Sequence, residues 1–385
     1  MISRTTRRIF VWCQRKCSTK TTIPSKVLFF GTDSMSMPAL REIVSRGTSL
    51  ASGLEVVCPE DRVLRVRGKK RIEIAATKQF CMEQGIKFHE IPSKADKLRQ
   101  KEAWACLREH VRNEEFDLGV VISFGYFLPS SLLKLFPRGA INVHPSLLPK
   151  YRGAAPIEHA LLNNDKVTGV SIIEVDPSRF DAGHVLSQSK HTIDPSPLFG
   201  ASELLRELSY LGARDVVDVM EHLDMRRLNA KPQDESNISR APKIRSEFGQ
   251  IDWRNMSGEQ IFGRFRALSS RTGIYTHFNR SGDCNEQRRV MLRQISLPHH
   301  HHHHANSDMK NMKQILQLNS DDDTFFEPGT AVYDKSNQVI WIRCSGNDDW
   351  VLCGELQVER KKSLRALDFA NGFQFMKRGT SIKFN

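Results

Sequence analysis

The segment KVLFFGTDSMSMPALREIVSRG, residues 26–47, decides the fold. Its first part is an uninterrupted apolar run, typical of a strand that is buried on both faces, and the run breaks at Gly31. The part that follows has apolar residues at helical spacing, at Met37, Leu40 and Val44. The segment therefore predicts the first strand, turn and helix of an α/β unit.

The alternation of strand and helix patterns continues as far as residue 176. Strands that alternate with helices predict a Rossmann-like, mostly parallel sheet with helices on both faces. In such a fold the reactive groups gather in the crevice beyond the carboxyl ends of the strands. The further strand candidates are residues 54–59, 87–92, 117–125, 140–144 and 169–176.

The second half of the chain has a different pattern. A long amphipathic helix is predicted over residues 200–224, and short alternating strands follow a polar stretch. We therefore expect an α/β domain over 26–226, a linker over 227–248 and a small C-terminal β-barrel (OB-like) domain over 249–385. The strand candidates of the second domain are residues 288–298, 329–344 and 349–358.

A His-rich insert near residues 299–323 interrupts the β-rich domain. Six adjacent histidines cannot all face one metal ion from a regular element, so we expect a flexible surface loop. We assign this insert no function.

The positive charge of the chain is concentrated at its N-terminus. The formal net charge of the 385 residues is +13, and no acidic residue occurs before Asp33. The Arg-, Ser- and Thr-rich opening predicts a mitochondrial transit peptide over residues 1–25, and hence a protein of the mitochondrial matrix. The alternative is a basic arm that stays attached and contacts nucleic acid. No apolar run approaches the roughly 20 residues that a membrane span needs.

The stretch INVHPSLLPKYRGAAPI, residues 141–157, carries the first candidate site. Asn142 and His144 lie two residues apart at the end of a predicted strand, so both side chains leave the same face. An amide and an imidazole that point into one crevice can donate hydrogen bonds to a developing oxyanion. The alternative is a core histidine with satisfied hydrogen bonds beside a turn residue.

A carboxylate is the third candidate of this site. In EVDPSRFDAGHVL, residues 174–186, Asp181 precedes a Gly-containing turn and can face the crevice, where it would orient His144 and relay protons through water. Asp176 lies nearer the strand end and is a rival for the role. The spacing alone does not choose between the two carboxylates.

These motifs, together with FFGTD near the start and VVISFGYFLP at residues 120–129, closely resemble the formyltransferase family that uses 10-formyltetrahydrofolate. The resemblance implies that Asn142, His144 and Asp181 are the catalytic residues. It also implies a folate co-substrate and no metal. The residues implied to contact the folate are Ser146, Leu147, Leu148 and Pro149 in one loop, and Phe124, Gly125, Tyr126 and Phe127 in another.

Two further features resemble the methionyl-tRNA formyltransferases within that family. A basic segment after the second strand matches their RGKK loop for the tRNA acceptor stem, and the C-terminal half resembles their β-barrel domain motif by motif. The implied partner is initiator methionyl-tRNA, formylated for mitochondrial translation by a monomeric enzyme. The residues expected to contact tRNA are Arg67, Lys69, Lys70, Arg360, Lys361 and Lys362.

Two other interpretations stay open from the sequence. One is a formyltransferase with a small amine as acceptor, which the basic loop and the C-terminal domain disfavour. The other is an RNA-binding protein without catalytic activity, which the presence of Asn142, His144 and Asp181 disfavours.

Overall fold

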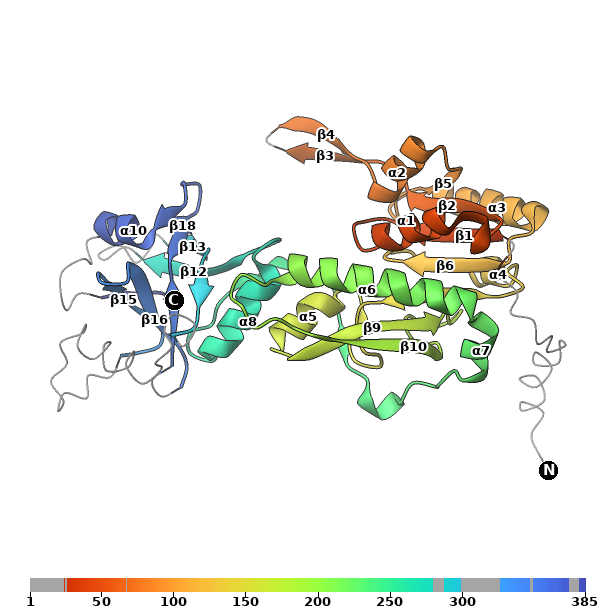
Figure 1. Cartoon of the computed structure of the whole chain (residues 1–385). Helices are drawn as coiled ribbons and strands as arrows, with labels where there is room; N and C mark the ends of the chain where they lie inside the picture. The colour runs from red at the N-terminus through yellow and green to blue at the C-terminus, as the bar shows by residue number, and fades with distance from the viewer. Residues whose placement is uncertain are drawn as a thin grey trace, which may run out of the picture.

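The computed structural model (Figure 1) describes residues 24, 26–66, 68–279, 287–298, 326–346, 349–373 and 381–385. The predicted transit peptide, apart from Pro24, lies outside the described residues. So do Arg67 and the predicted insert at 299–323.

A seven-stranded sheet forms the centre of the N-terminal domain, with the strand order β10-β9-β7-β6-β1-β2-β5. The five strands from β7 to β5 are parallel, whereas β9 and β10 run antiparallel to their neighbours. The predicted mostly parallel, Rossmann-like sheet is therefore confirmed. Its strands are β1 (Lys26–Gly31), β2 (Gly53–Pro59), β5 (Phe88–Ile91), β6 (Leu118–Ile122), β7 (Ala140–His144), β9 (Val167–Glu174) and β10 (Val185–Thr192).

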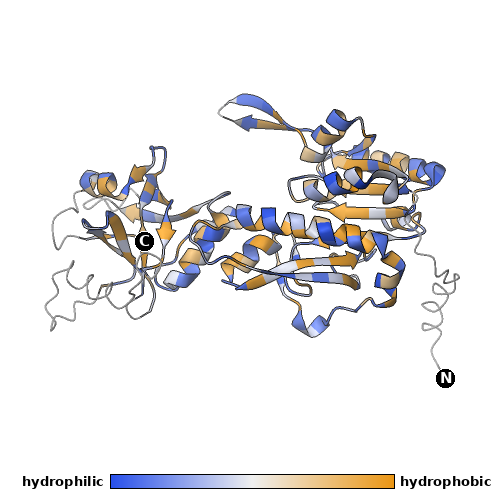
Figure 2. Ribbon diagram, in the orientation of Figure 1, coloured by the Kyte–Doolittle hydropathy of each residue, from blue (hydrophilic) through white to orange (hydrophobic). Residues whose placement is uncertain are grey.

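Alternate residues of β1 enter two separate hydrophobic clusters, because successive side chains of a strand point to opposite faces. Val27 and Phe29 belong to the cluster that includes α1 and α6, whereas Leu28 and Phe30 pack with α3 and α4. Figure 2 shows the apolar strands between helices that are polar on their outer faces. The helices of this domain are α1 (Met37–Arg46), α2 (Ala76–Gln84), α3 (Lys97–Glu114), α4 (Ser130–Leu133), α5 (Pro156–Leu162), α6 (Ala201–Glu221) and α7 (Leu223–Leu228).

The predicted basic loop after β2 is a β-hairpin that projects from the domain (Figure 1). Its strands are β3 (Arg62–Val66) and β4 (Lys69–Glu73), which pair antiparallel. Gly68 in the connecting turn has φ +78°, a conformation that glycine adopts without steric cost. The basic residues therefore lie on a paired ribbon with a defined register.

The predicted linker lies against the N-terminal domain. Its strand β11 (Arg240–Ala241) pairs in parallel with β8 (Arg152–Gly153), directly after the segment that carries Asn142 and His144. The predicted boundary at residue 226 falls inside α7. The domain limits stay predictions, but the residues after α7 contribute backbone pairing to the first domain.

The C-terminal part consists of antiparallel strands, as expected from its alternating pattern. They form a four-stranded sheet, β12-β13-β18-β19, and a five-stranded sheet, β14-β17-β16-β15-β20. The backbone of Gly354 donates to Gln294 where the two sheets meet. The closed, OB-like barrel stays a prediction, because the described pairings assign the strands to two sheets. The strands are β12 (Ile274–Asn279), β13 (Gln287–Leu292), β14 (Ile295–Ser296), β15 (Thr330–Asp334), β16 (Val339–Arg343), β17 (Trp350–Cys353), β18 (Glu355–Val358), β19 (Leu364–Arg365) and β20 (Ile382–Lys383).

Helix α8 (Gly258–Leu268) joins the two parts by packing on α5. Ser257 caps this helix by accepting from the Gln260 N–H, while the Gln260 side chain accepts from the Ser257 N–H. Arg266 is buried and donates through Nε to the carbonyl of Phe199 at 2.7 Å. The remaining helix is α10 (Ala366–Gly372). Within the described residues, every helix is too short or too polar to cross a bilayer.

Candidate active site

Strand β7 carries Asn142 and His144 to the carboxyl edge of the sheet. The two residues pair with Ile173 and Ser171 of β9, which fixes the register of the strand end. His144 is 5% exposed and Asn142 is half-buried. The side-chain amide of Asn142 has no hydrogen-bond partner among the described residues. The amide is therefore available to a ligand.

The two ring nitrogens of His144 have different partners. Nε2 lies 2.9 Å from the carbonyl oxygen of Tyr151, and Nδ1 lies 3.5 Å from Oδ1 of Asp181. A carbonyl only accepts hydrogen bonds, so Nε2 carries a proton. Nδ1 is thus the ring atom that faces the reactive side, and a proton on it as well makes an imidazolium whose charge Asp181 compensates.

Asp181 lies in the loop between β9 and β10 with φ +54°. Its Oδ2 accepts a hydrogen bond from the backbone N–H of Gly153 at 2.9 Å, and its side chain is 12% exposed. Asp176 instead accepts from the backbone of Ser178 and Arg179. Burial raises the pKa of Asp176, but these local hydrogen bonds outweigh it and hold the pKa below its usual value. The structure thus brings Asp181, and not Asp176, to His144.

Two glycines permit this approach of the loops. A Cβ on Gly183 would lie 1.7 Å from the carbonyl oxygen of Glu174, and a Cβ on Gly153 would lie 2.5 Å from that of Ala241. Gly153 also has φ +130°. Both positions therefore require glycine, because any side chain would push the loop away from the crevice.

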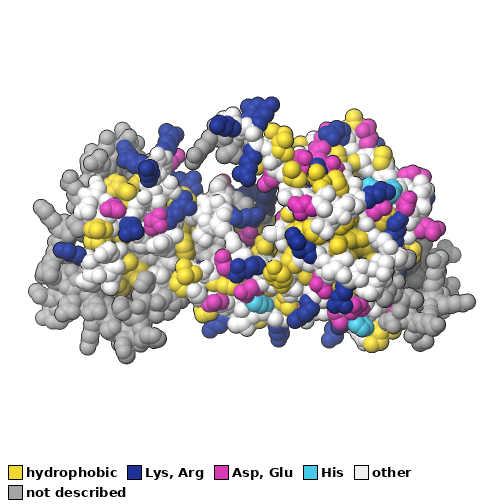
Figure 3. All heavy atoms as spheres, turned by 45° about the horizontal axis from the view of Figure 1, so that its top comes forward, with side chains coloured by type: hydrophobic (Ala, Val, Ile, Leu, Met, Phe, Trp, Pro, Cys, Tyr) yellow, Lys and Arg dark blue, Asp and Glu magenta, His cyan; other side chains and the backbone are white. Residues whose placement is uncertain are grey.

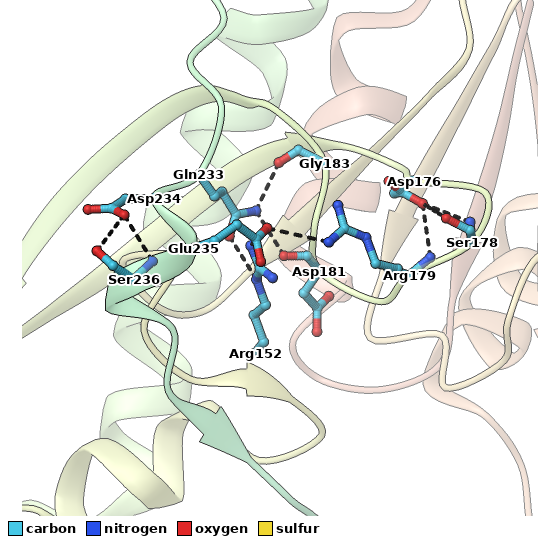
Figure 4. A network of polar contacts seen from close by, with 10 residues as sticks. All are labelled: Arg152, Asp176, Ser178, Arg179, Asp181, Gly183, Gln233, Asp234, Glu235 and Ser236. Carbon is cyan, nitrogen blue, oxygen red and sulfur yellow. Dashed lines mark hydrogen bonds and ion pairs between the residues drawn. The ribbon is translucent and has the colours of Figure 1, made fainter. Parts of the chain in front are cut away.

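The polar segment after α7 forms hydrogen bonds with the loop that carries Asp181 (Figure 4). Gln233 donates from Nε2 to the carbonyls of Asp181 and Gly183, at 2.8 Å each. Its Oε1 accepts from Nε of Arg152 at 2.9 Å. Ser239 accepts through Oγ from the Tyr151 N–H at 2.9 Å. The sequence pattern predicts only a linker for this segment, because a polar composition carries no signal of long-range pairing.

The first predicted folate loop is held by hydrogen bonds from the neighbouring strands. Ser171 on β9 donates through Oγ to the carbonyl of Ser146 at 2.6 Å and accepts from the Leu148 N–H at 3.0 Å. Gln188 on β10 donates to the carbonyl of Leu148 at 2.7 Å. Ser146 and Leu148 are buried, whereas Leu147 and Pro149 are half-buried. Contact of this loop with a folate stays a prediction.

The second predicted folate loop follows β6 and turns at Gly125, which has φ +75°. Phe124 is 3% exposed, and its ring packs edge-on against Phe30 at 5.4 Å. The side chain of Phe124 is thus part of the core, and a contact of this residue with folate stays a prediction that would involve its backbone. Phe127 is 40% exposed, and its ring lies 4.8 Å from that of Phe180, the residue directly before Asp181. The sequence pattern did not predict this ring pair.

The described residues among those expected to contact tRNA lie on exposed surfaces. Lys69 and Lys70 are exposed on β4 of the hairpin, and Arg67 lies outside the described residues. Figure 3 shows Lys and Arg side chains on the hairpin and on the C-terminal part of the same face. The second basic cluster is the exposed turn after β18, which consists of Arg360, Lys361 and Lys362.

Among the described residues, one group of Glu and His side chains is close enough together to hold a metal ion. It lies on β2, β5 and α3. Oε2 of Glu55 lies 2.6 Å from Nε2 of His89 and 2.7 Å from Nε2 of His110. The ammonium of Lys87 lies 3.4 Å from Oε1 of the same carboxylate. Because a cation already neutralises Glu55, we assign this cluster to the stability of the domain.

Comparisons with known proteins agree with this arrangement. The formyl transferase model matches residues 25–201, and the model of the formyl transferase C-terminal domain matches 243–374. The chain is 32% identical over 357 residues to the mitochondrial methionyl-tRNA formyltransferase of Homo sapiens, a match that covers 91% of this chain and 78% of that protein. It is also 32% identical to the methionyl-tRNA formyltransferase of Dictyoglomus turgidum, with 91% and 96% covered.

Solved structures share the fold at low sequence identity. HypX from Aquifex aeolicus, in complex with tetrahydrofolic acid, has a TM-score of 0.51 at 14% identity, with 91% of this chain covered. The match covers 48% of HypX, so this chain spans about half of its length. The N-formyltransferase of Helicobacter canadensis, in complex with folinic acid and dTDP-3-aminofucose, has a TM-score of 0.52 at 13% identity, with 86% and 98% covered.

Proposed function

This chain belongs to the formyl transferase family of enzymes, and on that premise we propose that it transfers the formyl group of 10-formyltetrahydrofolate to the α-amino group of methionyl-tRNA. The product is N-formylmethionyl-tRNA, which initiates protein synthesis in the mitochondrial matrix. The enzyme acts as a monomer. The mitochondrial location is supported by the basic, Ser- and Thr-rich N-terminus and by the mitochondrial relatives.

In the proposed reaction the neutral amine of methionyl-tRNA attacks the formyl carbon of the folate. The new C–N bond gives a tetrahedral intermediate whose oxyanion accepts hydrogen bonds from the Asn142 amide and from Nδ1–H of His144 in its doubly protonated form. The C–N10 bond then breaks, and the proton of the attacking amine moves to N10 through a water held by Asp181. Atoms and charge balance without a further reactant.

The single observation that carries this proposal is the contact between Nδ1 of His144 and Asp181, at the strand end that also carries Asn142, whose side-chain amide has no partner among the described residues. Nε2 of His144 is occupied by Tyr151, so the ring cannot rotate without losing that hydrogen bond. Such fixed donors stabilise a developing charge without reorganisation during the reaction.

The folate would enter beside the loop at 146–149 and the exposed ring pair Phe127–Phe180. Flat rings of the folate can pack on such exposed aromatic edges. Lys69, Lys70 and the cluster Arg360–Lys362 would contact phosphates of the tRNA, because surface cations bind polyanions through counterion release.

The test is to incubate the protein with 10-formyltetrahydrofolate and methionyl-tRNA, and to measure N-formylmethionine released from the tRNA. We expect formylated product that depends on both substrates. Formylation of small amines alone would favour the small-acceptor interpretation. Binding of tRNA without any formyl transfer would favour the RNA-binding interpretation, and either result would overturn the proposal.

A further inference from the structure

The side chain of Gln233 connects the segment between the two domains with the loop of Asp181 (Figure 4). We propose that Gln233 is a positioning residue, which sets the carboxylate of Asp181 against His144 without touching the substrates. This inference rests on the proposed function, since it deepens the role given there to Asp181.

The contacts of Gln233 enclose the turn that carries the carboxylate. Nε2 donates to the carbonyl of Asp181 and to that of Gly183, at 2.8 Å each, so one amide group ties the two ends of a three-residue turn. Asp181 itself has φ +54°, which is uncommon outside glycine and costs energy. Hydrogen bonds at both ends of the turn stabilise this conformation.

The orientation of the Gln233 amide is fixed in turn by charged neighbours. Nε of Arg152 donates to Oε1 at 2.9 Å, so the oxygen faces the guanidinium and Nε2 faces the carbonyls. A flipped amide would place an N–H against a cation and an oxygen against two carbonyls. Glu235 accepts from Arg152 at 3.3 Å and holds the guanidinium in place. The network therefore has one satisfied arrangement.

The same network is anchored on the opposite side of the site. Arg152 belongs to β8, whose next residue, Gly153, donates its N–H to Oδ2 of Asp181. Gln233 and Gly153 thus hold the backbone and the side chain of one residue from two directions. Removal of Gln233 would leave the Gly153 contact in place but free the turn, so the distance of 3.5 Å between Nδ1 of His144 and Oδ1 of Asp181 would no longer be fixed.

The experiment compares four variants in the formylation assay: Gln233→Ala, Asp181→Asn, the double variant and Asn237→Ala as the matched control. Asn237 lies in the same segment, and its side-chain amide donates to Asp234 and not to the site. We expect Gln233→Ala to lower kcat about 10- to 100-fold, since misplacement of a group by about 1 Å can cost about 10² in rate. The KM values for both substrates should change less than about twofold, and Asn237→Ala should match the wild type.

The double variant separates positioning from a general structural effect. Asp181→Asn keeps the turn but has no carboxylate to position, so Gln233→Ala should lower kcat no further in that background. Full additivity of the two losses, or a rise in KM that equals the loss in kcat, would overturn the positioning role. Wild-type turnover by Asp181→Asn would instead overturn the proposed role of Asp181, whereas a slow Asp181→Asn beside a fast Gln233→Ala would overturn only the inference about Gln233.

Discussion

His144 at the end of β7 is 5% exposed, whereas Val63 and Ile72 on the projecting hairpin are 63% and 62% exposed. The imidazole has a partner at each ring nitrogen: the Tyr151 carbonyl from the loop that directly follows β7, and Asp181 from the loop between β9 and β10. Val63 and Ile72 pair with each other across β3 and β4. The site depends on contacts between separate loops, whereas the two strands of the hairpin pair locally with each other.

The difference follows from what each region is proposed to do. Stabilisation of a transition state requires donors fixed to within a fraction of an ångström, so the crevice is buried and braced from several elements. Contact with a polyanion requires positive charge at some distance from the fold, where long side chains can adapt to phosphates. Substitutions should therefore change turnover in the first region and affinity in the second.

The largest effect is expected for His144→Ala. Loss of one preorganised donor to an oxyanion costs about 10² to 10³ in kcat, and the KM for methionyl-tRNA should hardly change. Steady-state kinetics with both substrates measure this. The control is His222→Ala, which removes an imidazole from the exposed end of α6 and should leave kcat unchanged. Wild-type turnover by His144→Ala would refute the assignment, and Asn142→Ala should show a loss of the same order.

Gly183→Ala tests whether the crevice depends on backbone geometry. The added Cβ would lie 1.7 Å from the Glu174 carbonyl, so the turn of Asp181 must move and kcat should fall by about 10². Gly372→Ala is the matched control, because a Cβ there meets nothing within 4 Å. Equal activity of the two variants would show that the loop position does not matter for the reaction.

The double variant Lys69→Ala/Lys70→Ala tests the hairpin. Each lost phosphate contact weakens tRNA binding by about fivefold near 0.15 M salt and lowers the slope of log Kd against log salt by about 0.7 to 0.9. The kcat at saturating tRNA should stay within about twofold. Binding is measured by filter retention at several salt concentrations, with Lys101→Ala on α3 as the control. An unchanged salt slope would exclude phosphate contacts by this hairpin.

Lys361→Ala should have a smaller effect of the same kind. A single lost contact on the C-terminal part predicts at most about a fivefold weaker Kd for tRNA and unchanged turnover. Lys335→Ala, in the exposed turn between β15 and β16, is the matched control in the same domain. If both variants bind tRNA equally well, the turn after β18 does not contact the RNA.

The cluster of Glu55, His89 and His110 should affect stability without affecting the rate. Burial lowers the pKa of His89 more than its hydrogen bond to Glu55 raises it. Because the folded pKa lies below the unfolded value of about 6.5, the unfolded chain binds more protons and stability falls as the pH drops below that value. His89→Gln should flatten the decrease of Tm between about pH 6.5 and pH 5. An identical decrease of Tm in the wild type and in His89→Gln would contradict this. As a control, kcat of the two proteins should be the same.

Much of the fold could be predicted because the pattern and the burial agree locally. Strand β7 was predicted at residues 140–144, where the structure has it, and β1 to α1 follows the apolar run and the helical spacing as expected. Strand β10 was missed, since this edge strand buries only Leu186 and carries polar side chains over most of its length. Antiparallel β9 could not be distinguished from a parallel strand, because orientation depends on the connection and not on the strand itself.

The site could be predicted only in part, for a related physical reason. Asn142 and His144 share one strand end, so their common direction follows from the strand period. The choice of Asp181 over Asp176 depends on a loop conformation with positive φ and on hydrogen bonds from Gly153 and Gln233. Such contacts join residues that are far apart along the chain, and no local pattern encodes them.

The strand β11 has a consequence for anyone who wishes to recombine this protein. The match to the first family model ends at residue 201, and the match to the second begins at residue 243. The segment with Gln233 and Ser239 therefore belongs to neither match. A cut at residue 226 would separate the catalytic half from its own support. Fusion to a foreign acceptor-binding module should therefore begin after Ala241, at the end of β11, and not at the end of the long helix.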